Sequence, residues 1–441
     1  MADSYFKRAL ERLSNGGETS RFGRGAFWLS LGSAASQLLG AASGILAARI
    51  LGSEGFGALN ILRSSVDMIT MFAGMGLGVT ANRFVALYRA EFPAKAGEVI
   101  GMATGIAWAG ALAASIGTLT FSNGLARLLN APQLHAEIQM SAMLILLATA
   151  TSAYSGVLAG LESFREQATI SIIVAVVSAP LIVGGVLVAG VRGGVGGMIV
   201  ASGLSLILSI RAAGRMAAQN SIVVVFSWSS EQRRILRAFT LPALISAGLV
   251  IPVFWIGNVV LAGTASGYHQ LGLFAAANHW RQAIVVIPNI LASVSLPILT
   301  RLFGAGDSQK FRSLLRNNLL LVGAVTMIPA IVLSVFSRPI LNLYGGAFES
   351  AWPVMVLLLF TGVAFSLTSI LGQVIASVGR MWIGLGLNAC WASAFVFVAW
   401  FLCPAYGAIG LAGAYASSYG LHLMLSMVVA YRLLSLRDAN H

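Results

Sequence analysis

The amino-acid sequence predicts an all-α polytopic membrane protein built from two similar halves. Of its 441 residues, 58% are hydrophobic and only 9% are charged, and the mean hydropathy is +0.86. A soluble domain carries roughly 25% charged residues, so this chain has too few charges to cover a water-exposed surface. The second observation is a series of long apolar segments, and the third is a repetition of short motifs at one spacing along the chain.

Twelve segments reach the length of about 20 mostly apolar residues that a helix needs to cross the hydrocarbon core. The gaps between them are short, so we expect no inserted soluble domain. In chain order the predicted spans cover residues 26–50, 58–86, 97–120, 136–159, 167–190, 194–216, 236–262, 270–300, 314–336, 351–378, 381–402 and 408–432.

Lysine and arginine fall mainly in alternate gaps, which predicts the orientation because short cytoplasmic loops carry the excess of positive charge. Placing the N-terminus inside puts 20 of the 27 basic residues on the cytoplasmic side. The net charge of +13 then belongs to loops and tails, and no nucleic-acid partner is expected. Both termini are predicted to be cytoplasmic. The predicted parts are an N-terminal tail at 1–25, an N-lobe at 26–216, a basic cytoplasmic linker at 217–235, a C-lobe at 236–432 and a C-terminal tail at 433–441.

An internal repeat relates the predicted lobes. Six spans separate the equivalent motifs, and because six is even the two halves have the same orientation. Such parallel repeats are related by an axis along the membrane normal, and transport sites lie between the halves near the midplane. The paired motifs are Gly57-Ala-Leu-Asn60 with Gly272-Leu-Phe-Ala275, Ser155-Gly-Val-Leu-Ala-Gly160 with Leu371-Gly-Gln-Val-Ile-Ala376, and Gly193-Gly-Val-Gly196 with Gly407-Ala-Ile-Gly410, at offsets of 215, 216 and 214 residues.

The first 90 residues carry a recognisable outline. Span 1 leads through Arg49-Ile-Leu-Gly-Ser-Glu-Gly-Phe-Gly-Ala-Leu-Asn60 into span 2, and Gly74-Met-Gly-Leu-Gly78 and Asn82-Arg-Phe-Val-Ala-Leu-Tyr-Arg89 follow. This outline resembles the polysaccharide transporter branch of the multidrug/oligosaccharidyl-lipid/polysaccharide flippase superfamily, which includes Wzx-type O-antigen and exopolysaccharide flippases. Span count, loop lengths and repeat extend the resemblance over the whole chain.

The resemblance implies two six-helix lobes around a central cavity that opens alternately to either side. It also implies a flippase that moves a polyprenyl-pyrophosphate-linked oligosaccharide from the cytoplasmic to the outer leaflet of a bacterial inner membrane, for assembly of a surface polysaccharide. The implied partners are this lipid-linked oligosaccharide, membrane lipids, and polysaccharide polymerase and export proteins.

Polar side chains inside the spans are the candidate site. Arg63 and Asp67 are four residues apart on span 2, so they share one helical face and can pair; Asn60 continues that face. Span 8, the repeat equivalent of span 2, carries a second polar group. Its members are Asn278, His279, Arg281 and Gln282.

We expect Arg63 and Arg281, with Asn60, Asn278 and Gln282, to line the cavity and bind the pyrophosphate, because guanidinium forks match phosphate oxygens bidentately. An arginine within a span is costly and usually faces a cavity or a partner. The alternative is structural: Arg63 and Asp67 form a helix-stabilising ion pair, and Arg281 extends towards the outer interface.

Titratable groups deep in the spans are candidates for ion coupling. The two candidate residues are Asp67 and His279, and the coupling ion would be H⁺ or Na⁺. The alternative for His279 is structural, because a lone intramembrane histidine more often donates one hydrogen bond across a helix interface. Arg83 and Arg89 are expected to anchor the protein to acidic lipid headgroups. Two cysteines are too few for a metal site or a disulfide framework, and no metal or other cofactor is expected.

Two other functions fit the sequence less well. A cation-coupled multidrug and toxin extrusion antiporter of the same fold commonly relies on carboxylates in span 1 or in the second lobe, and this sequence has none within those spans. A membrane glycan polymerase or ligase usually needs a long external loop with catalytic residues, and the outer loops here are short. No phosphate-loop motif for ATP occurs either. The sequence therefore favours a secondary transporter over an enzyme.

Overall fold

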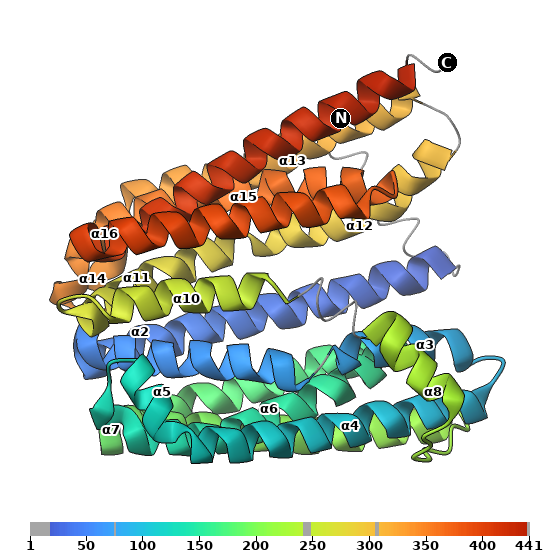
Figure 1. Cartoon of the computed structure of the whole chain (residues 1–441), viewed down its shortest axis with the longest axis horizontal. Helices are drawn as coiled ribbons and strands as arrows, with labels where there is room; N and C mark the ends of the chain where they lie inside the picture. The colour runs from blue at the N-terminus through green and yellow to red at the C-terminus, as the bar shows by residue number, and fades with distance from the viewer. Residues whose placement is uncertain (1–17, 75, 241–247, 305–307, 439–441) are drawn as a thin grey trace.

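The computed structural model describes residues 18–74, 76–240, 248–304 and 308–438, and within these ranges the chain is helical without a β-strand. Figure 1 shows the first half of the chain, blue to green, packed against the second half, yellow to red. The elements of the first half are α2 (Glu18–Ala73), α3 (Leu77–Tyr88), α4 (Pro93–Thr120), α5 (Ser122–Leu128), η1 (Pro132–Leu134), α6 (His135–Gly160) and α7 (Phe164–Gln219). Next come α8 (Ser230–Ile235) and η2 (Leu236–Thr240), which pack on the first half. Those of the second half are α10 (Val250–Ala262), α11 (Gly267–Ile284), α12 (Val286–Gly304), α13 (Ser308–Val335), α14 (Ser337–Asn342), η3 (Gly346–Ala351), α15 (Trp352–Ser377) and α16 (Met381–Asp438).

Seven of the described helices are long and apolar enough to cross a membrane. Three of them, α2, α7 and α16, contain 56, 56 and 58 residues. At a rise of about 1.5 Å per residue a straight helix of that length would be more than twice as long as the hydrocarbon core is thick. Each bends at a glycine with positive φ, namely Gly52 (69°), Gly190 (58°) and Gly407 (55°). These bends lie at or near the predicted boundaries between spans 1 and 2, 5 and 6, and 11 and 12.

Two predicted spans are interrupted. Residues 58–86 divide into the second part of α2 and α3, because Gly76 adopts a left-handed conformation at the start of α3. Residues 270–300 divide into α11 and α12 just before Pro288, which has no N–H to donate to the preceding turn. Part of the predicted span 236–262 lies outside the described residues. The all-α membrane fold is confirmed, whereas the count of twelve crossings stays a prediction.

The predicted repeat is visible in the order of the elements. The series α4, α5, η1, α6 and α7 recurs as α13, α14, η3, α15 and α16. The short helices α5 and α14 begin 215 residues apart, at Ser122 and Ser337. The bends at Gly190 and Gly407 have nearly the same backbone angles, with ψ of −137° and −129°. The two halves therefore share local structure as well as short motifs.

The lobes meet mainly through α2 and α11, and the ribbons diverge towards the end that carries α3 and α8 (Figure 1). A buried cluster crosses the contact and includes Phe56 of α2 and Phe274 of α11. Across the contact, Tyr268 donates its hydroxyl hydrogen to the carbonyl oxygen of Leu129 at 2.7 Å. The lobes are therefore joined most firmly at one end of the molecule.

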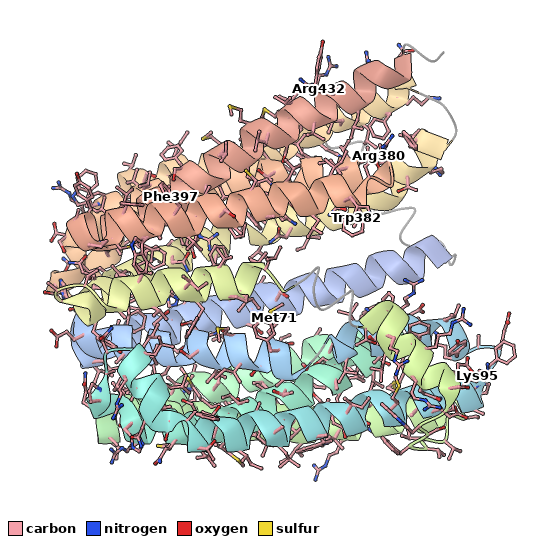
Figure 2. All side chains as sticks on the ribbon, viewed as in Figure 1. Met71, Lys95, Arg380, Trp382, Phe397 and Arg432 are labelled. Atoms are coloured by element: carbon pink, nitrogen blue, oxygen red, sulfur yellow. The ribbon has the colours of Figure 1, made fainter. Side chains whose placement is uncertain are left out.

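The basic residues of the predicted cytoplasmic loops gather at the opposite end. Figure 2 shows Lys95 in the first half, and Arg380 and Arg432 in the second half, on the side towards which the lobes diverge, with Phe397 towards the other end. Which end faces the cytoplasm stays a prediction. Of the predicted tails, residues 1–17 and 439–441 lie outside the described part; α2 already begins at Glu18, and α16 continues to Asp438.

Candidate functional site

A central cavity of about 910 Å³ lies between the lobes. Its walls come from α2, α3, α6, α10, α11 and α16, and Figure 2 shows Met71, one of its lining residues, between the two halves. Seven polar residues that the sequence singled out all line it. They are Asn60, Arg63, Asp67, Asn278, His279, Arg281 and Gln282.

Arg281 is a buried cation in the wall of the C-lobe. Its side chain is only 7% exposed, its Nε donates to Oδ1 of Asn278 at 2.7 Å, and its Cζ lies 5.2 Å from the ring centroid of Tyr415. Among the described residues no carboxylate comes within 4.0 Å of this guanidinium. A buried charge is costly without a partner, and an amide with an aromatic face compensates for it only in part. The side chain therefore does not extend towards an interface but stays buried in the wall of the cavity.

Arg63 and Asp67 lie one turn apart on α2, and both are exposed towards the central cavity. In the described part of the chain no ion pair within 4.0 Å joins them. The direct ion pair that the spacing allows is therefore not formed in this conformation. Both side chains are available to a ligand in the cavity.

His279 reaches from α11 to the first part of α2. A Cβ placed on Gly44 would lie 3.0 Å from Cε1 of His279, and the imidazole meets the ring of Phe56 edge-on at 5.8 Å between centroids. Its Nδ1 is buried and has no hydrogen-bond partner among the described residues. His279 therefore touches both lobes, and any motion between them changes its surroundings.

A second cavity of about 580 Å³ lies within the N-lobe and shares Ser36, Gly40, Arg63 and Asp67 with the central one. Apart from Arg63 and Asp67, its lining residues are not among those predicted from the sequence. A signal was available, since Ser202, Ser205 and Ser209 recur on one face of α7 at helical spacing. The serines that line it are Ser36, Ser43, Ser155, Ser171, Ser178, Ser202, Ser205 and Ser209.

Aromatic residues of the central cavity were also missed. Tyr415 of α16 stacks on Phe254 of α10, with ring centroids 4.8 Å apart. Trp255 donates its Nε1 hydrogen to the hydroxyl of Ser65 across the lobes at 2.9 Å. Only the packing of α10 and α16 against α2 and α11 brings these rings to the cavity, and no sequence spacing reveals that.

The remaining nominated arginines lie outside the central cavity. The guanidinium of Arg83 stacks over the ring of Phe239 with 4.5 Å to the centroid. Arg89 forms an ion pair with Glu162 at 2.6 Å. Both side chains therefore brace the α3 end of the N-lobe, and their contact with lipid headgroups stays a prediction.

Fold and cavity together define a two-lobed helical membrane protein with two arginines in the wall of its central cavity. The family described as Polysaccharide biosynthesis protein matches residues 22–303. The chain belongs to this family, which confirms the resemblance seen in the sequence.

Curated relatives share part of the chain. The EPS I polysaccharide export inner membrane protein EpsE of Ralstonia nicotianae is 30% identical over 196 residues, which cover 44% of this chain and 45% of the relative. The protein of the same name from Ralstonia solanacearum is also 30% identical over 196 residues. The match thus spans less than half the length of these curated relatives.

Solved structures share the fold over nearly the whole chain. An inward-facing multidrug resistance MATE family transporter of the MOP superfamily has a TM-score of 0.74 at 15% identity. The match covers 92% of this chain and 96% of the transporter's chain. A MOP superfamily transporter from Pyrococcus furiosus has a TM-score of 0.68 at 15% identity, covering 97% and 98%. The chain is therefore a membrane protein of the Polysaccharide biosynthesis protein family, and it shares its fold with these transporters.

Proposed function

We propose that the protein moves a polyprenyl-pyrophosphate-linked oligosaccharide from the cytoplasmic to the outer leaflet of the bacterial inner membrane. The observation that carries this proposal is the guanidinium of Arg281, buried in the central cavity without a carboxylate partner among the described residues. A pyrophosphate supplies the missing negative charge in a shape that a guanidinium fork matches.

The surrounding residues fit the remainder of such a headgroup. Arg63 lies on the opposite lobe and lines the same cavity, so the two arginines attract an anion from both sides. Asn60, Asn278 and Gln282 add amide groups that donate to phosphate and sugar oxygens. We assign the pyrophosphate to the arginines and the first sugar to these amides.

Alternating access follows from the way the lobes meet. They are joined where α2 and α11 touch and diverge at the α3 and α8 end. With the orientation predicted from the basic residues, the joined end is the outer one, and the cavity faces the cytoplasm. Rocking about this contact would present Arg63 and Arg281 to each side in turn. Coupling to H⁺ or Na⁺ through Asp67 and His279, and cooperation with polymerase and export proteins, are further parts of this proposal.

A multidrug antiporter is the second candidate, because the fold is shared. Its cationic substrates would meet Arg63 and Arg281 in the central cavity, where Asp67 is the single acidic residue among those described as lining it. Like charges repel more strongly in a site of low dielectric constant, so the cavity suits anionic cargo better.

The test uses a deletion strain and an impermeant label for sugars on the outer leaflet. Lipid-linked oligosaccharide should accumulate in the cytoplasmic leaflet, and wild-type protein should restore its export. R281E should not restore export at equal protein abundance, whereas the control R338E should, because the Arg338 side chain packs over Trp352 outside the cavity. Unchanged leaflet distribution in the deletion strain, with increased sensitivity to cationic drugs, would favour the antiporter.

A further inference from the structure

A pocket of about 630 Å³ opens between the two parts of α7, away from the central cavity. Arg165, Thr169 and Ile173 line it from the first part of the helix, and Leu208, Arg211 and Arg215 line it from the returning part. None of these six residues belongs to the central cavity or to the serine-lined cavity of the N-lobe.

The pocket is charged at one end and apolar at the other. Arg165, Thr169 and Ile173 follow one another at intervals of four residues, so they lie along one face of the helix. In the returning part of α7, which is antiparallel to the first, Arg215 lies at the end that carries Arg165. Arg211 and then Leu208 follow in the direction of Ile173. The arginines therefore sit together at the end of the hairpin, and Ile173 and Leu208 lie about 12 Å further along, by the rise of a helix. This change from charge to hydrocarbon matches the change from headgroup to acyl chain at a membrane surface.

The charged end favours an anion. Arg211 and Arg215 line this end together with Arg165, and Glu166 is the one acidic residue among the described residues that line the pocket, so the lining carries a net positive charge. The end of the pocket also coincides with the N-terminus of α7, where Ser163 makes no side-chain capping hydrogen bond. The helix dipole adds to the attraction for negative charge there.

We propose that this pocket binds a membrane lipid whose phosphate-bearing headgroup has a net negative charge, with an acyl chain along Ile173 and Leu208. Basic pockets between transmembrane helices are suited to such headgroups, whereas arginines that only set membrane orientation need no pocket. Ile170 lines both this pocket and the serine-lined cavity, so a bound lipid would also support the wall of that cavity. The proposal concerns lipid binding and does not depend on the transported substrate.

The test measures lipid binding to the purified full-length protein by native mass spectrometry and by thermal unfolding. Cardiolipin should remain bound and raise the Tm, whereas phosphatidylcholine should not. R211Q/R215Q should reduce cardiolipin occupancy at least about tenfold, and R211K/R215K should recover part of it because lysine keeps the charge but not the planar fork. The matched control is R233Q/R234Q in α8, whose arginines are equally exposed but do not line the pocket.

Further arms identify the lipid. Displacement of cardiolipin by a polyprenyl pyrophosphate would identify the pocket as a site for the lipid-linked substrate, and failure of displacement would identify a resident phospholipid; both agree with a phosphate-bearing lipid. Inorganic pyrophosphate that competes as strongly as the lipids would contradict the proposal, because the apolar half would then contribute nothing. Equal cardiolipin occupancy in R211Q/R215Q and wild type would also overturn it. Should the double variant aggregate, R215Q alone replaces it under the same criteria.

Discussion

Gly57 of α2 and Gly272 of α11 each pack against the backbone of the other's helix. A Cβ on Gly57 would collide with the carbonyl oxygen of Tyr268, and one on Gly272 would collide with that of Ser53. Ser53 and Tyr268 are 215 residues apart, as are the two glycines. Reciprocal contacts of this kind arise where a two-fold axis passes between equivalent surfaces. The pseudo-symmetry axis thus passes through a contact that only glycine permits.

Replacing either glycine should separate the lobes at this end. We expect G57L or G272L to lower the free energy of unfolding by about 3 kcal/mol, because overpacking a close backbone contact forces the helices apart. Thermal unfolding and export assays measure the effect. G203L is the control, since a Cβ at Gly203 meets nothing within 4 Å. Equal Tm values for G57L and G203L would contradict the close contact.

We expect Asn278 to affect substrate affinity because it positions Arg281. N278A removes the oxygen that accepts from Nε of Arg281, and a hydrogen bond to a charged group contributes about 1.5–3 kcal/mol. We expect affinity for the lipid-linked substrate to fall about tenfold or more while the protein stays folded. N388A serves as the control, because Asn388 lines a separate cavity in the C-lobe. A loss of the same size in both variants would show that Asn278 has no special role in positioning Arg281.

The linker between the lobes lies in a glycine groove on α4. Gly97, Gly101 and Gly105 recur at intervals of four residues, and the extended segment 222–226 runs along them; a Cβ on Gly101 would come 2.8 Å from the backbone nitrogen of Phe226. We expect G101L to release the linker and expose it to protease. G117L, in the same helix with open space at Cβ, should leave cleavage unchanged. A resistant linker in G101L would show that the groove does not hold it.

An ion pair fastens the end of this linker. Nζ of Lys95 contacts both carboxylate oxygens of Glu231 at 3.0 Å, and this hydrogen bond raises the pKa of Lys95. Because the pKa is raised, the pair is fully present below the ordinary pKa of lysine and is lost as pH rises through the higher value. Protease sensitivity of the linker should therefore stay constant from about pH 6 to about pH 9 and increase with salt. K95E should open the linker, and K95E/E231K should restore it.

Replacing Asp67 tests whether substrate binding can be separated from coupling to an ion gradient. If it carries the coupling ion, D67N should abolish the dependence of export on an ion gradient while substrate affinity is kept or increased, because a negative charge beside Arg63 is removed. Export driven by a proton or sodium gradient in reconstituted vesicles measures this. D67N that keeps its full gradient dependence would remove Asp67 from the coupling role.

Composition and local spacing determined much of this protein. The scarcity of charge required a membrane, and the spacing of four residues between Arg63 and Asp67 placed both on one helical face. The glycine motifs fell at or near bends because positive φ is strained for other residues. These inferences needed only short-range geometry, which the order of residues specifies directly.

Tertiary structure alone decided which faces meet. The ring of Tyr415 over Arg281, the contact of His279 with Gly44 and the linker in the groove of α4 join residues that are distant in sequence. An apolar membrane helix is nearly uniform around its circumference, so its pattern does not reveal which side faces lipid, a neighbour or a cavity. The spacing of Arg63 and Asp67 allows an ion pair, but no such pair forms in the described chain. The spacing along the helix permits the pair, and the tertiary structure decides that the two side chains stand apart.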